Sequence, residues 1–255
     1  MAAIMLLTIS SFVRLAFGAA NADGLIEVQH VHLVGKALPG YHKKLLDLGV
    51  TFCAGRGIKV ALPPPGTSLH ETIDDNYYAP GGMSFYQERK VYIIDKDCRL
   101  ARRETLIITT WTSLGACKTE RETKQSTGYC DVDIASLSRL PDSKSVNRKI
   151  VPDGETRRIA GHSCTFFSNN VLAPSRMCIA RDGVFAKVLT WPSMSYGALL
   201  RMELRSASGS DTEIATNEAT EIHTNVMIPI TTFAPQLSGK YKVVSLSYPT
   251  TESDQ

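Results

Sequence analysis

The second half of the chain carries the pattern that most constrains its fold, a series of alternating segments joined by turns from residue 157 to residue 236. In residues 200–205 every second side chain is apolar and the others are charged. This period of two is typical of a β-strand with one buried and one solvated face. Residues 221–230 alternate in the same way, and Pro229 restricts that strand to a sheet edge or a bulge. The pattern predicts an antiparallel β-meander.

Two further stretches, residues 183–191 and 104–111, are apolar on both faces. Such a pattern favours strands that are covered on both sides or that line a cavity. A β-sandwich, in which the second face meets a helix or another sheet, explains it equally well. From these stretches and the 221–230 strand we take six apolar residues as candidates for lining a ligand cavity: Phe185, Leu189, Trp191, Ile107, Trp111 and Met227.

The six cysteines predict a disulfide framework. Cys164 and Cys178 lie symmetrically about a turn-rich loop, so hairpin pairing sets them opposite each other. A bridge there closes a loop of about 15 residues and contributes on the order of 3 kcal/mol. The alternative is two buried free thiols. Cys117 and Cys130 form a second hairpin-like pair, which leaves Cys53 with Cys98; the even count favours three bridges in an oxidising compartment.

The start of the chain resembles a secretory leader. An apolar run at residues 4–13 precedes the small-x-small triplet of residues 20–22, so we predict a signal peptide over residues 1–22 and a periplasmic or secreted protein. The run is too short to span a bilayer, so we expect no transmembrane segment in the mature chain. Residues 23–248 are predicted to form one domain and residues 249–255 a frayed tail.

Two segments of the first half have local signals of their own. Residues 42–48 offer one or two helical turns before Gly49. Residues 62–82 are rich in Pro, Gly, Asp, Asn and Tyr, which predicts a long loop or lid. Long irregular segments in compact domains are usually functional or mobile.

Several classes of function lack support in the sequence. The 28 basic and 25 acidic residues give a net charge of +3 and are interspersed, which argues against a nucleic-acid partner. No C-x-x-C, G-x-S-x-G, H-E-x-x-H or glycine-rich phosphate loop occurs. His30 and His32 would share one face of a strand, yet no third metal ligand is indicated by spacing. We therefore assign no catalytic residue, no metal site and no cofactor, and expect a non-enzymatic protein.

Three segments, RRIAGHSC, RMCIARDGVFAKVL and NEATEIHTNVMIPITTFAPQ, resemble the second half of the LolA/LppX-like bacterial envelope proteins. More narrowly, they are similar to uncharacterised exported members with an I-A-G-x-x-C strand and an E-A-T strand. The resemblance covers at most residues 83–236. The positions carried over, all as scaffold, are Ile159, Ala160, Gly161, Cys164, Cys178, Glu218, Ala219, Thr220, Phe233 and Pro235.

The resemblance implies a mainly β (α+β) fold, a strongly curved antiparallel sheet or unclosed half-barrel with one or two covering helices or loops. It also implies an apolar cavity that holds acyl chains in some relatives. We therefore expect an exported, non-enzymatic protein that binds a hydrophobic ligand, such as a lipid or a lipidated peptide, in the hollow of the sheet. The alternative is a disulfide-stabilised structural or adhesion module that acts through a protein partner of the cell envelope.

Overall fold

The computed structural model of the chain describes residues 24–37, 39–139, 151–169, 175–190, 195–205 and 213–245. The predicted leader, the predicted tail and Trp191 lie outside these ranges. Within them, no helix combines the length and the apolar character needed to cross a membrane.

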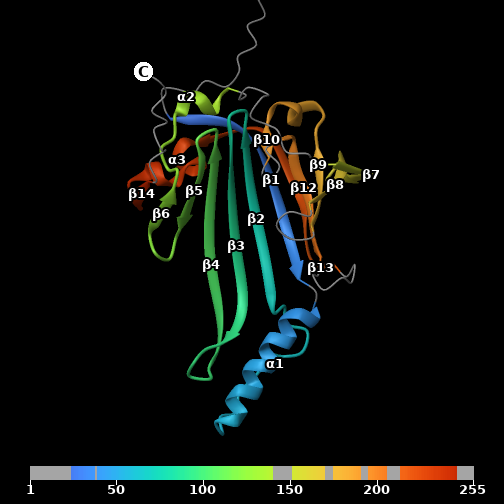
Figure 1. The fold of residues 1–255 in the computed structure, drawn as a ribbon, viewed down its shortest axis with the longest axis vertical. Helices are drawn as coiled ribbons and strands as arrows, with labels where there is room; N and C mark the ends of the chain where they lie inside the picture. The colour runs from blue at the N-terminus through green and yellow to red at the C-terminus, as the bar shows by residue number, and fades with distance from the viewer. Residues whose placement is uncertain are drawn as a thin grey trace, which may run out of the picture.

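One large sheet dominates the described part of the chain (Figure 1). It has 12 strands in the order β14-β6-β5-β4-β3-β2-β1-β13-β12-β9-β8-β7. All neighbours pair antiparallel except β14 and β6, which run parallel. The sheet is curved and does not close, because β14 and β7 remain as its two edges. The predicted fold class is confirmed.

The strands of this sheet are β1 (Leu25–Ala37), β2 (His70–Ala79), β3 (Gly82–Ile94), β4 (Leu100–Thr112), β5 (Gly115–Glu120), β6 (Gln125–Gly128), β7 (Val151–Ile159), β8 (His162–Asn169), β9 (Ser175–Ala180), β12 (Ala198–Arg205), β13 (Glu213–Pro229) and β14 (Lys242–Ser245). A separate two-stranded ladder pairs β10 (Leu189–Thr190) with β11 (Ser195–Tyr196). The helices are α1 (Pro39–Gly55), α2 (Ile134–Leu137), α3 (Ile230–Phe233) and the 3-10 turns η2 (Gly183–Lys187) and η3 (Pro235–Ser238).

The predicted loop or lid over residues 62–82 is wrong for residues 70–79, which form β2, whereas residues 62–69 lie in no helix or strand. Burial alternates along this strand, but several of its buried residues are polar: Thr72, Asp74 and Asn76. A search for alternating apolar residues cannot find a strand whose inward side chains are polar. The turn after β2 packs closely on α2, since a Cβ on Gly81 would lie 1.9 Å from the backbone oxygen of Ser136.

The predicted strand over residues 183–191 is also wrong. Gly183 adopts a left-handed φ of 56° and opens the 3-10 turn η2, which interrupts an extended chain. The turn places Phe185 and Val188 in the core, while Val184 points outward. The apolar residues therefore lie on two sides of a turn, and among the described residues of this stretch only 189–190 form a strand.

Helix α1 is longer than predicted and runs through Gly49 to residue 55. A Cβ on Gly49 would lie 3.0 Å from Cδ1 of Ile94 in β3. The glycine therefore permits close packing of helix on strand and does not end the helix. Residues 104–111 fall within β4, as predicted.

The three predicted disulfide bridges are present, joining Cys53 to Cys98, Cys117 to Cys130 and Cys164 to Cys178. All six half-cystines are buried. Cys164 and Cys178 belong to the largest apolar cluster, where β8 pairs with β9.

Both faces of β1 are covered by apolar packing. One face contributes Val31 and Leu33 to the cluster that contains Phe185 and the 164–178 bridge. The other face contributes Ile26 and Val28 to a second cluster, which is closed by residues of α2 and α3. Two apolar clusters on opposite sides of one curved sheet explain why β1 has buried apolar residues on both faces.

A buried tyrosine hydroxyl links the two halves of the sheet. Tyr78 Oη accepts hydrogen bonds from the backbone N–H of Leu199 at 3.1 Å and from Asn76 Nδ2 at 3.2 Å. We expect Tyr78→Phe to lower the free energy of unfolding by about 1–3 kcal/mol, because a buried N–H loses its acceptor. Urea denaturation measures this, with Tyr92→Phe on β3 as the half-exposed control. Equal stability losses for both variants would contradict the proposed role.

Candidate functional site

A pocket of about 480 Å³ lies where β1 ends and β2 begins. Its volume is within the range of small-molecule sites, roughly 300–1,000 Å³. It is lined by Val34, Gly35, Ser68, His70, Glu71, Thr72 and Ile73.

Strand pairing sets the walls of this pocket. Val34 faces Ile73 and Gly35 faces Thr72 in the β1–β2 register. A Cβ on Gly35 would lie 2.3 Å from Asn217 Oδ1 and 2.9 Å from Thr72 Cβ. Only glycine allows β1 to approach its neighbours so closely at this point.

Two stacked histidines join α1 to the pocket. The rings of His42, in α1, and His70, on the pocket wall, lie 4.2 Å apart with an interplanar angle of 24°. Burial lowers the pKa of His42. Burial, followed by the charges of His42 and Arg89, lowers the pKa of His70. Both imidazoles are therefore neutral at neutral pH, and Glu71 is paired with Arg102 at 3.1 Å.

The six cavity candidates from the sequence do not line this pocket. Phe185 is fully buried in the main core. Ile107 and Trp111 lie on β4, half-buried, whereas Met227 is 43% exposed on β13. Three strands separate β4 from β13. Leu189 starts β10, and Trp191 lies outside the described residues, as does the side chain of Leu189.

The sequence did not identify the pocket residues, because most of them lie in the segment taken for a loop. The one available signal was the alternation of residues 70–79 with polar side chains at the inward positions. The glycine at position 35 gives no indication of its role until β2 and β13 are placed on either side of it.

His30 and His32 share one face of β1, as predicted, and form a row with residues of β2 and β13 that we call the histidine row (His30, His32, Asp75, Tyr77, His223). Asp75 Oδ1 lies 2.8 Å from His30 Nε2 and 2.8 Å from His32 Nδ1. The His30 ring stacks on Tyr77 at 4.7 Å and on His223 at 5.6 Å.

The histidine row stabilises the carboxylate of Asp75. Burial by itself raises the pKa of Asp75, but the hydrogen bonds to His30 and His32 outweigh it and hold the pKa below its usual value. Among the described residues, no group of three or more His, Cys, Asp or Glu side chains is arranged to hold a metal ion. The row is a ring stack braced by a shared carboxylate.

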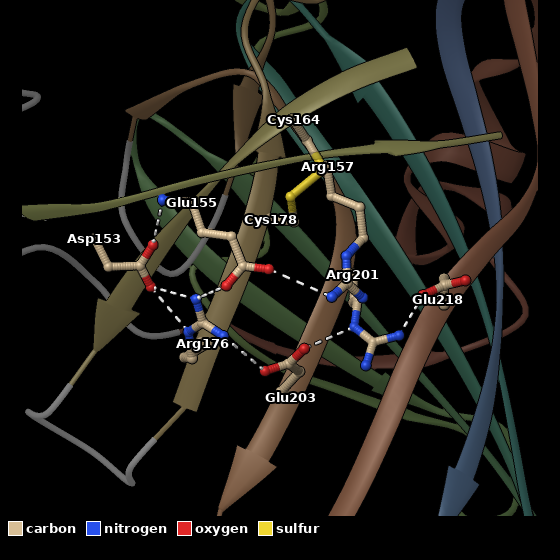
Figure 2. The surroundings of a disulfide bond; sticks show 9 residues. All are labelled: Asp153, Glu155, Arg157, Cys164, Arg176, Cys178, Arg201, Glu203 and Glu218. Carbon is tan, nitrogen blue, oxygen red and sulfur yellow. Dashed lines mark hydrogen bonds and ion pairs between the residues drawn. A yellow bond between two sulfur atoms is a disulfide. The ribbon is translucent and has the colours of Figure 1, made fainter. Parts of the chain in front are cut away.

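A charged ladder crosses the other half of the sheet, close to the 164–178 disulfide (Figure 2). Arg176 contacts Asp153 at 2.8 Å and Glu155 at 2.6 Å, and also reaches Glu203. Arg201 contacts Glu203 at 2.8 Å and pairs with Glu218. Because each arginine is committed to carboxylates of this chain, the ladder braces strands β7, β9, β12 and β13 and does not offer an anion site.

No protein-family model matches this chain, and no curated protein matches it. The resemblance to the LolA/LppX-like group stays a prediction.

Proposed function

We propose that this protein is an exported, non-enzymatic binding protein. It holds a hydrophobic small ligand, such as a lipid acyl chain, in the pocket where β1 ends and β2 begins. The pocket itself is the observation that carries the proposal: its volume is about 480 Å³ and its walls include Val34 and Ile73. Pockets of this size are typical of small-ligand sites, in which polar groups orient the ligand against apolar walls. The polar residues of this lining are Ser68, His70, Glu71 and Thr72.

Two further observations support the proposal. The lowered pKa values of His42 and His70 keep the imidazoles beside the pocket uncharged, so a hydrophobic ligand would not displace hydration from a cation there. Three disulfides among the described residues fit an oxidising compartment. Export and the absence of catalysis are parts of the proposal.

Native mass spectrometry of protein isolated from its source envelope should detect a co-purifying lipid, and the apo protein should take up a dansyl-labelled fatty acid. We expect Ile73→Glu to weaken uptake at least tenfold, about 1.4 kcal/mol, because the acid places a charge on the pocket wall. Ile107→Glu is the matched control, since Ile107 is also half-buried but lies on β4, away from the pocket.

The two variants separate the outcomes. Weaker uptake by Ile73→Glu alone supports the pocket. Loss of uptake in Ile107→Glu alone would place the ligand on the β4 surface that the sequence pattern suggested. A protein that neither carries lipid nor takes up the probe contradicts the proposal.

A further inference from the structure

Helix α1 displays an apolar stripe that no described residue covers. Leu45, Leu48 and Phe52 are 51%, 68% and 63% exposed. Their spacing of three and four residues puts them on one side of the helix. An adjacent side of the helix, roughly 100° around its axis, is already used, because Leu46 and Cys53 are buried and Gly49 packs on Ile94.

Two more large apolar side chains are exposed in the segment that follows the helix, Ile58 at 38% and Leu62 at 48%. We call residues 42–62, which comprise most of α1 and the segment that follows it, the docking tip. Single exposed apolar residues are ordinary on protein surfaces, but a contiguous set of large ones marks an interaction site.

The docking tip is also basic. The docking tip contains Lys43, Lys44, Arg56 and Lys59 against a single acid, Asp47, and all five are exposed. Its net charge of +3 equals that of the whole chain. Bulky apolar residues flanked by lysine and arginine are the combination that binds the interface of an anionic bilayer.

The docking tip is held firmly at one end of the molecule. The Cys53–Cys98 bridge ties the end of α1 to the β3–β4 turn, and Arg56 Nη1 donates to the Lys96 carbonyl at 2.9 Å. Figure 1 shows α1 beside that turn, at the opposite end of β2, β3 and β4 from α2 and α3. A flat surface can therefore meet the tip without meeting the rest of the sheet.

We propose that the docking tip binds the surface of an anionic lipid bilayer, with Leu45, Leu48 and Phe52 at the acyl boundary and the net positive charge of the tip attracting it to the headgroups. His42, at the start of the tip, stacks on His70 of the pocket wall. Docking would thus bring the pocket close to membrane lipid. This connection between docking and the pocket rests on the proposed function, whereas docking itself does not.

Vesicle flotation of the mature protein tests the proposal, with liposomes of phosphatidylcholine alone and with about 30% phosphatidylglycerol. We expect binding to the anionic liposomes, at least tenfold weaker binding to the neutral ones, and weakening by high salt, which screens headgroup attraction. We expect L48S/F52S and K43E/K44E each to bind the anionic liposomes at least tenfold more weakly than the unmodified protein. V243S/V244S is the control, because Val243 and Val244 are exposed at the sheet edge.

The outcomes are distinct. Binding that requires both the apolar and the basic residues supports docking. Absence of binding to anionic liposomes overturns it, as does binding that L48S/F52S leaves intact. Sedimentation equilibrium tests the alternative that a second copy of the chain covers the stripe. A dimer that L48S/F52S dissociates, without liposome binding, would assign the stripe to that second copy.

The two proposals can fail independently. Ile73→Glu should still bind liposomes, and the tip variants should still take up dansyl fatty acid.

Discussion

Replacing Asp74 with asparagine is expected to stabilise the protein by up to about 3 kcal/mol at pH 8 and by almost nothing near pH 3. Burial raises the pKa of Asp74 from 3.8 to about 6, although hydrogen bonds from Gln87 and Asn217 and the charge of Arg89 oppose the shift. A difference of about two pH units corresponds to about 3 kcal/mol. Its side chain lies in the sheet interior, and its Oδ1 has no hydrogen-bond partner.

The sign follows from proton binding. Between pH 3.8 and about 6 the folded chain holds a proton on Asp74 that the unfolded chain has released, so this group makes stability fall as the pH rises through that window. Above pH 6 both states are ionised and the full cost remains. Asparagine is neutral throughout and can still accept from Asn217, which donates to the Asp74 carboxylate.

Urea denaturation of both proteins between pH 3 and pH 8 measures the effect. Asp75→Asn is the matched control, because the pKa of Asp75 is lowered by its histidine partners and its contribution is present above pH 3.8 and lost at lower pH. The control should therefore lose stability at pH 8, where Asp74→Asn gains it. An Asp74→Asn protein no more stable than wild type at pH 8 would mean that the buried carboxylate costs nothing.

Removing the 164–178 bridge by Cys164→Ala and Cys178→Ala is expected to lower the free energy of unfolding by about 3 kcal/mol or more. The two cysteines are 14 residues apart in sequence. Closing a loop of this length contributes about 3 kcal/mol in the chain-entropy model. Both cysteines also pack in the main core with Phe166 and Phe185, so losing the two sulfur atoms adds a packing cost.

The 117–130 bridge provides a comparison, because its two cysteines are 13 residues apart and close a loop of almost the same length. It lies among β4, β5 and β6, outside the main apolar cluster. The entropy contribution should be the same for both bridges, so an excess loss in the 164–178 variant measures core packing. A loss below about 1 kcal/mol for the 164–178 variant would show that this bridge does not stabilise the fold.

Whether a strand could be predicted from the sequence depended on whether its inward-facing residues are apolar. Strand β12 was identified because alternate residues such as Leu200 are apolar, and β4 because residues 104–111 carry apolar side chains on both faces. Strand β2 was missed because Asp74 and Asn76 occupy its inward positions. The apolar residues of 183–188 pack on the core through a 3-10 turn, and periodicity cannot separate such a turn from a two-faced strand over so few residues.

The chain alone determined the features that short segments carry: the antiparallel strands of the second half and the pairing of cysteines that flank hairpin turns. These depend on local alternation and on neighbours about 15 residues apart. Only the tertiary structure decided where the pocket lies, that Asp74 is buried, and that one side of α1 is left uncovered. Each of these results from strands distant in sequence meeting at a particular register, and a residue's exposure is a property of those neighbours and not of its own type.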